Sequence, residues 1–201
     1  PRLVGDQGVV TLPEQIREAL LVRWREPRRR YHGETHLRDG LNALRRLGGG
    51  EVEQISFWFH DAVQTGATPA DELASADLVD ELLGGILPSH MVGEVRRLVL
   101  LTIDHRAEAG DGAGARVCDA DLHGLGSAPS RYKTNVEGVR AEVPHVGEGE
   151  WRAARLRFVE GMLARPHIFA TPTGRGLWEE AARANLAREA GALLRGSALG
   201  E

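Results

Sequence analysis

Apolar side chains along this 201-residue chain recur at the spacing of helices and do not alternate as they do in strands. Runs rich in Val, Ile, Thr and aromatic residues are nearly absent, so little in the sequence indicates a β-sheet. We therefore expect an all-α fold, a single-domain helical bundle over residues 1–201. The expected helices cover about residues 16–24, 32–47, from 52, from 69, 91–105, 116–125, 132–143, 151–163 and 178–193.

Two boundaries between these helices have clear local signals. Thr68, Pro69 and Asp71 read as an N-cap, a first-turn proline and a third-position carboxylate, a variant of the capping box. The glycine-rich segment 107–114 is expected to be a loop, which follows a helix that runs to His105.

Composition limits the classes of partner. Lys and Arg total 25 and Asp and Glu total 29, so the formal net charge is −4 and a nucleic-acid partner is not expected. The one cysteine, Cys118, excludes an intramolecular disulfide and a zinc site built from cysteines. No apolar run approaches the ~18 residues of a membrane span, and the first residues lack the apolar stretch of a signal peptide. We therefore expect a cytoplasmic protein without a membrane partner.

Two of the eight histidines, His32 and His36, are four residues apart. On a helix they would share one face, with Cβ atoms about 5–6 Å apart. Both imidazoles could then bind one metal ion, or one could bind it while the other acts as acid or base. Glu34 would face the opposite side, which argues against the zinc-protease helix. Alone, a pair with this spacing is more often a solvated helix face.

The dipeptide His60-Asp61 follows the apolar segment 55–59. An imidazole and a carboxylate that emerge from a core helix need a polar partner, and one divalent cation satisfies both. The alternative is a helix end at the surface, with Asp61 paired to an arginine.

Two further carboxylates, Asp119 and Asp121, are separated by their positions on a helix. Cys118, Leu122 and Leu125 define its apolar stripe, and Asp121 lies about 65–70° from the centre of that stripe. Asp119 lies about 90–95° away on the other side. Asp121 is therefore the better inward-facing ligand, and Asp119 better suits a position behind the ligands, for instance orienting an imidazole.

The ordered set His36, His60-Asp61 and Asp121, on helices of an all-α domain, resembles the H…HD…D signature of the HD-domain superfamily of metal-dependent phosphohydrolases. Within about residues 20–190 the chain also resembles a bacterial subgroup of predicted phosphohydrolases in that superfamily. The similar stretches are residues 26–36, 57–61, 71–76, 102–105, 119–126, 140–142 and 182–186. The resemblance implies an HD-type bundle in which His36, His60, Asp61 and Asp121 hold one divalent transition metal.

The resemblance also implies roles for two other residues. His32 would protonate the leaving oxygen, and Glu72 would help to handle the attacking water. An equally weighted alternative makes Glu72 a partner of the helix dipole, because acidic residues favour a first turn.

His105 falls on the inward stripe of its expected helix and is a third catalytic candidate. It could ligate a second metal, donate to phosphate or be a satisfied core histidine. His90 is the other histidine that could complete a two-metal centre. Over a continuous helix it would lie about 22 Å from His105, too far for two metals about 3.5–4 Å apart. We therefore expect one metal, chosen from Mn, Ni, Co, Fe and Zn.

Phosphate would need cationic and hydroxyl donors. The candidates downstream of the last ligand are Arg131, Tyr132, Lys133 and Arg140, although a solvated helix face explains that cluster equally well. The expected function is hydrolysis of a small phosphorylated metabolite, most plausibly a nucleotide, by a metal-activated water. The alternative is a non-catalytic HD module that binds metal and nucleotide as a sensor or scaffold. A homo-oligomer is compatible with the sequence.

Overall fold

The structure, a computed structural model, describes residues 12–197. Every regular element in this range is helical, apart from one isolated β-bridge between Gly84 and Leu87, so the expected all-α fold is confirmed for these residues. The helices are α1 (Glu14–Trp24), α2 (Glu34–Arg46), α3 (Glu51–Phe59), α4 (Ala70–Leu83), α5 (Ser89–Leu100), α6 (Gly112–Leu122), α7 (Pro129–Glu142), α8 (Glu148–Leu163), α9 (Pro172–Gly174) and α10 (Glu180–Ser197). Short helical turns cover Leu101–Ile103, His123–Gly126 and Arg175–Glu179.

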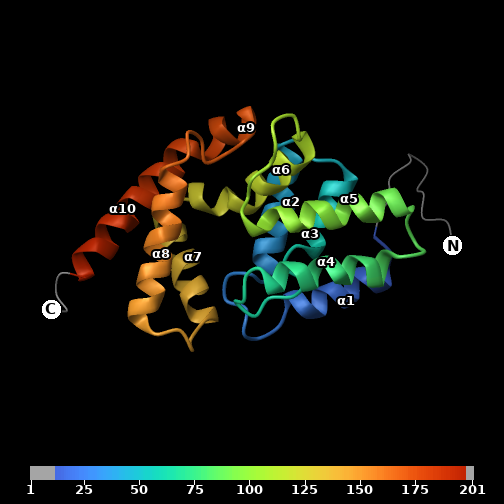
Figure 1. The fold of residues 1–201 in the computed structure, drawn as a ribbon, viewed down its shortest axis with the longest axis horizontal. Helices are drawn as coiled ribbons and strands as arrows, with labels where there is room; N and C mark the ends of the chain where they lie inside the picture. Colours follow the sequence, from blue (N-terminus) through green and yellow to red (C-terminus); the bar gives the residue numbers. More distant parts are fainter. Residues whose placement is uncertain (1–11, 198–201) are drawn as a thin grey trace.

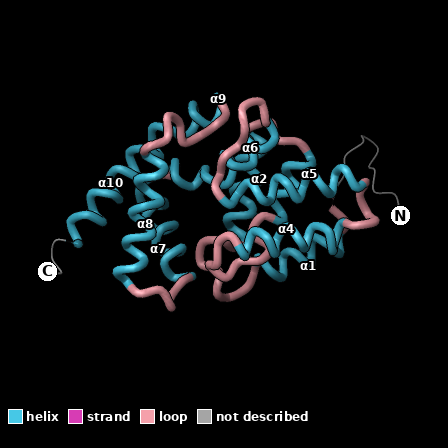
Figure 2. Tube along the Cα trace, in the orientation of Figure 1, coloured by secondary structure: helices cyan, strands magenta, loops and turns pink. Residues whose placement is uncertain are grey.

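The helices form two groups. Figure 1 shows α1 to α6 towards one end of the molecule and α7, α8 and α10 towards the other. In the first group, α4 packs on α5, and α3 contacts α2, α5 and α6; in the second, α10 packs on α8. The turn His123–Gly126 contacts both α7 and α10 and so joins the groups. Figure 2 shows that loops make the connections between the helices.

No helix within residues 12–197 combines the length and the apolar character needed to cross a membrane.

Helix α3 is anchored in the core by its aromatic residues. Phe57 and Phe59 are fully buried. Trp24 of α1 donates its indole N–H to the carbonyl of Trp58 at 3.0 Å, which ties α1 to α3. Burial of each large apolar side chain contributes roughly 1.5–3 kcal/mol. The core thus fixes the C-terminal end of α3, where His60 follows.

A glycine allows α2 to lie directly on this aromatic core. Gly40 is buried on α2, and a Cβ atom added there would collide with the ring of Phe57. That ring cannot move aside freely, because it is fully buried and packs against the imidazoles of His36 and His60, with ring centroids 5.8 and 4.2 Å apart. The close approach at Gly40 therefore sets the distance between the helices that carry these two histidines.

The helix expected over residues 32–47 starts later, at Glu34. The carboxylate of Glu142 accepts hydrogen bonds from three consecutive backbone N–H groups before this helix, at 2.6–2.9 Å; they belong to Arg30, Tyr31 and His32. The chain turns around this carboxylate before it becomes helical. His32 therefore lies outside α2, and the prediction that His32 and His36 share a helical face is wrong.

The start of α4 also differs from the capping pattern expected at Thr68. The helix begins at Ala70, and the Thr68 hydroxyl donates to Glu72 at 2.8 Å without capping the backbone. Asp71 instead closes the preceding turn: one of its oxygens accepts three backbone N–H groups at 2.6–2.9 Å, from Thr65, Gly66 and Ala67. The carboxylate thus satisfies the loop that enters the helix, not the helix itself.

The helix expected to reach His105 ends at Leu100 and continues as the turn Leu101–Ile103. His105 has a φ of 52°, in the left-handed region that few residues other than glycine adopt. Arg165 donates to the carbonyls of Asp104 and His105 at 2.8 and 3.0 Å, which holds this conformation. The estimate of about 22 Å between His90 and His105 assumed one continuous helix, and that assumption is wrong.

Three later helices, α6, α7 and α8, start earlier than expected; α8 begins at Glu148. The α6 helix begins at Gly112, because Asp111 accepts the N–H of Gly114 at 2.9 Å and caps the first turn. The α7 helix begins at Pro129, a residue well suited to a first helical position.

We predict that Gly40→Ala lowers the free energy of unfolding by about 1–3 kcal/mol, because the added methyl group overpacks the Phe57 site. Urea denaturation measures this change. Gly93→Ala is the matched control: Gly93 lies in α5, and a Cβ there meets nothing within 4 Å. That control should gain roughly 0.5–1 kcal/mol from helix propensity. Equal effects of both substitutions would contradict the packing described.

Candidate active site

Three side chains from different helices meet at one point. His36 lies on α2, His60 directly follows α3, and Asp121 lies near the end of α6. The two Nε2 atoms are 3.3 Å apart, and Asp121 Oδ1 lies 3.0 Å from that of His36 and 3.5 Å from that of His60. One donor atom from each residue lies within 4.8 Å of the others, which is close enough for all three to bind a single ion.

His60 is held in the orientation that a metal ligand needs. Its Nδ1–H donates to the carbonyl of Phe57 at 2.8 Å, so the lone pair of Nε2 faces His36 and Asp121. The imidazole of His60 is almost fully buried. Metal-binding histidines commonly donate their second ring N–H to a carbonyl, since this fixes the tautomer and the ring orientation.

Asp61 lies at the edge of this cluster. Its Oδ2 is 3.1 Å from Nε2 of His60 and 3.8 Å from Nε2 of His36. The structure does not have the alternative in which the Asp61 carboxylate pairs with an arginine. The nearby buried guanidinium of Arg29 donates instead to backbone carbonyls, at 2.7–3.1 Å. The acceptors are His32, Asp61 and Ala62. Arg29 therefore ties the turn before α2 to the turn after α3 and leaves the Asp61 carboxylate facing the histidines.

The charges of the cluster compensate one another. Burial alone would raise the pKa of Asp61 and Asp121, but the neighbouring His60 outweighs burial and lowers both pKa values below the usual range. Burial likewise opposes protonation of His60, yet these two carboxylates raise its pKa well above normal. The site therefore favours positive charge, and imidazole nitrogens with carboxylate oxygens are a donor set that divalent transition metals accept. The residues present fit such an ion.

Asp121 uses its second oxygen for a third histidine. Oδ2 lies 2.8 Å from Nε2 of His105, while Oδ1 faces His36 and His60. His105 thus reaches the same centre from the turn after α5, although it lies outside the helix that was expected to carry it. Its contact orients the Asp121 carboxylate.

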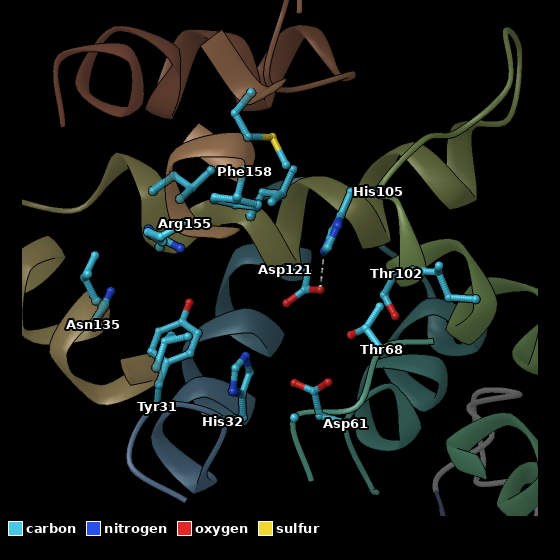
Figure 3. Close-up of a pocket in the computed structure, with 18 of the residues that line it drawn as sticks. Tyr31, His32, Asp61, Thr68, Thr102, His105, Asp121, Asn135, Arg155 and Phe158 are labelled. Carbon is cyan, nitrogen blue, oxygen red and sulfur yellow. Dashed lines mark hydrogen bonds and ion pairs between the residues drawn. The ribbon is translucent and has the colours of Figure 1, made fainter. Parts of the chain in front are cut away.

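A cavity of about 570 Å³ opens beside the cluster, and residues from both groups of helices line it. Figure 3 shows Asp61, Asp121 and His105 on one side of it, His32 and Tyr31 below, and Arg155 and Phe158 on the far side. A volume of this order suits a small metabolite. Asp61 and Asp121 line it, so a ligand in this cavity can reach the carboxylates of the His/Asp cluster.

His32 lines the cavity and is held from behind by Glu142. Its Nδ1 lies 2.6 Å from Oε2 of Glu142, while Oε1 of the same carboxylate accepts the His32 backbone N–H at 2.9 Å. Gln64 lies 2.8 Å from Nδ1. Burial disfavours the imidazolium, but Asp61 and Glu142 outweigh burial and raise the pKa of His32 above 6.5. The two carboxylates therefore favour the protonated form of His32.

Glu72 also lines the cavity. Its Oε1 accepts the hydroxyl of Thr68 at 2.8 Å, whereas its buried Oε2 has no hydrogen-bond partner among the described residues. A buried carboxylate oxygen is costly without a donor. The free oxygen therefore suits a bound water or ligand better than the helix-dipole role alone.

Asp119 does not orient an imidazole. Its carboxylate faces away from the metal cluster and accepts the backbone N–H groups of Ala170 and Thr171 at 2.6 and 2.8 Å. The hydroxyl of Thr171 donates to it as well, at 2.6 Å. The role expected for Asp119 is therefore wrong: it fastens the segment before α9 to α6.

The expected phosphate-binding residues mostly lie elsewhere. Lys133 is exposed and pairs with Glu137, Arg140 packs on Trp151 and Arg131 pairs with Asp39; none of the three lines the cavity. Tyr132 does line it, but its hydroxyl donates to Glu189. Lys133 is thus on a solvated face, whereas Arg140 donates to the carbonyls of Val143 and Val146 and Arg131 lines a second cavity that also includes His36. The arginines that line the cavity are Arg106, Arg155, Arg157 and Arg165.

Glu142 and Arg29 hold the site together, and neither is among the residues that the sequence pattern predicts for it. Each uses one side chain to bind several backbone groups from distant parts of the chain. Both lie in stretches similar to the phosphohydrolase subgroup, 140–142 and 26–36, which is the one signal that points to them.

We predict that Glu142→Gln lowers the pKa of His32, because the neutral amide no longer stabilises the imidazolium. A pH titration followed by NMR of the imidazole C–H signals measures the shift. Glu137→Gln, an exposed change on the same helix, serves as the control and should leave the titration unaltered. An unchanged His32 titration in Glu142→Gln would refute the electrostatic role of Glu142.

We predict that Asp119→Asn lowers the free energy of unfolding by about 1–3 kcal/mol, since an amide N–H₂ would face backbone donors that need an acceptor. Metal content, measured by elemental analysis, should stay at the wild-type value because Asp119 lies outside the cluster. Loss of metal at unchanged stability would reverse this assignment.

Comparison with known proteins adds no relative: no protein-family model, no curated protein and no solved structure matches the chain. The function is therefore inferred from the residues and geometry of this chain.

Proposed function

We propose that the protein is a metal-dependent phosphohydrolase of the HD type that acts on a small phosphorylated metabolite, most plausibly a nucleotide. The observation that carries the proposal is the convergence of His36, His60 and Asp121 within 4.8 Å, beside a cavity of about 570 Å³. Asp61, 3.1 Å from His60, completes the ordered H…HD…D set that resembles this superfamily.

The metal would be held by His36, His60, Asp61 and Asp121. When bound, a divalent ion of this kind supplies Lewis acidity and lowers the pKa of a coordinated water towards neutrality. Mn, Ni, Co, Fe and Zn all accept this donor set.

The chain's own residues would move the protons. Glu72, which lines the cavity, would accept a proton from the water that attacks phosphorus. The bond from phosphorus to the leaving oxygen breaks, and His32, protonated with the help of Glu142, would donate its proton to that oxygen. The products are inorganic phosphate and an alcohol, or a shorter phosphate when the bond is an anhydride.

We predict that Asp61→Ala abolishes measurable hydrolysis and lowers metal affinity by at least about 10- to 100-fold, the range seen when residues that support a metal ligand are removed. Asp77→Ala, at a well-exposed carboxylate on α4, is the control and should leave both unchanged. Circular dichroism verifies that the variants stay folded.

The decisive experiment combines elemental analysis of the purified protein with phosphate release from a panel of nucleotides and phosphosugars. A bound transition metal and release that Asp61→Ala abolishes are the expected results. Absence of transition metal together with no release by metal-loaded protein would overturn the proposal. Thermal stabilisation by a nucleotide without turnover would instead favour the non-catalytic sensor or scaffold.

A further inference from the structure

Three of the arginines that line the cavity are Arg106, on the turn after His105, Arg157 of α8, and Arg165, which follows the end of α8. The guanidinium of Arg165 donates to the carbonyls of Asp104 and His105, and Arg106 is the next residue along that turn. Arg157 lies on α8, eight residues before Arg165. All three line the same cavity as the metal cluster.

Open space lies around Gly161, between Arg157 of α8 and Arg165, which follows the end of that helix. Arg157, Gly161 and Arg165 are spaced at i, i+4 and i+8, which places them on one side of the helix and its end. Gly161 also lines the cavity, and a Cβ added there meets nothing within 4 Å. A gap bordered by cationic side chains therefore lies at this position.

The positive charge of this cluster is not neutralised within the described residues. The guanidinium groups of Arg106 and Arg157 make no ion pair there, and Arg165 donates to backbone carbonyls alone. Asp104 is the neighbouring carboxylate, but it accepts the backbone N–H of Arg106 at 3.1 Å and forms no ion pair. Arg155, in contrast, is paired with Glu189 at 2.8 Å.

A nearby like charge also affects the pKa of Arg165. Burial, and then the nearby Arg106, lower the pKa of Arg165 below its usual value, and Asp104 offsets part of that effect. An anion placed between these guanidinium groups would relieve their repulsion.

We propose that Arg106, Arg157 and Arg165 form an anion subsite for a second anionic group of the substrate, distinct from the phosphate at the metal cluster. The inference rests on the proposed function for its meaning in catalysis. The substrate class is then a metabolite with two anionic groups, the second being a phosphate or a carboxylate. Guanidinium binds either through paired N–H donors.

The position of the arginines indicates which anionic group of the substrate each part of the cavity would bind. Arg165 reaches the active site through the backbone of His105, whose imidazole contacts Asp121. Arg165 of the subsite is thus separated from Asp121 by His105. The subsite recognises the part of the substrate that is not cleaved, so its loss should raise KM far more than it lowers kcat.

Binding to metal-free protein tests the subsite without any need for hydrolysis. Calorimetric titration of chelator-treated protein with inorganic phosphate and with pyrophosphate should show binding at low ionic strength. The double variant Arg106→Gln/Arg157→Gln should lower that affinity at least tenfold. Arg17→Gln, an exposed arginine on α1, is the control and should bind as the wild type does. No binding by the wild type, or equal binding by the double variant, would overturn the inference.

A second variant keeps every arginine. Gly161→Glu places a carboxylate in the gap, where it should occupy the guanidinium groups and abolish anion binding. Gly149→Glu is the matched control on α8, since Gly149 also has open space around it but does not line the cavity. Anion binding that survives Gly161→Glu would contradict the placement of the subsite.

Matched ligands then identify the second group. Glucose 6-phosphate carries one anionic group, whereas 6-phosphogluconate adds a carboxylate and glucose 1,6-bisphosphate adds a phosphate. If one ligand with two anionic groups binds at least tenfold more tightly than glucose 6-phosphate, and the double variant loses this gain, that ligand's additional group is the one that the subsite recognises. Equal affinity for all three would refute the inference. If the titrations show anion binding that the variants lose but no phosphate is released, the subsite is supported and the proposed hydrolysis is refuted.

Discussion

The carboxylate of Asp121 is the contact on which the site depends. One of its oxygens faces two imidazoles carried by α2 and α3, and the other faces His105 on the turn after α5. Four segments are thereby joined through one side chain. Ionisable groups this deeply buried are tolerated because each offsets the desolvation cost of the next. The close approach of α2 to Phe57 at Gly40 supplies the geometry in which this compensation works.

The site residues that could be predicted from the sequence are those whose position follows from a local pattern, such as helical periodicity. The helical wheel places Asp121 and Asp119 on different sides of the helix. In the structure Asp121 lies in the cluster, whereas Asp119 binds the backbone of residues 170–171. The helical period likewise predicts the all-α fold, although it misplaces several ends. Periodicity reports which face of a helix is buried, but a helix ends where backbone groups find other partners.

The remaining parts depend on pairings between distant segments. Glu142 binds the turn at 30–32, and Arg29 binds the carbonyl of Asp61, with no periodic pattern to indicate either contact. The phosphate-binding expectation failed for the same reason: Lys133 and Arg140 follow the last ligand in sequence, but their sides of α7 face away from the cavity. The arginines that do line it come from α8, from the residues just after α8 and from the turn at 104–106.

Because Glu142 holds the turn at 30–32 from the end of α7, the turn that carries His32 and the cluster of expected metal ligands can differ in local stability. All four expected metal ligands lie between residues 36 and 121, whereas His32, the proposed proton donor, is held by a residue at the end of α7. Local opening of that helix end releases the turn at 30–32 and leaves the ligands assembled. A partly opened molecule would therefore retain its ion while it has lost the means to protonate a leaving group, so metal retention is a poor measure of the competent fraction.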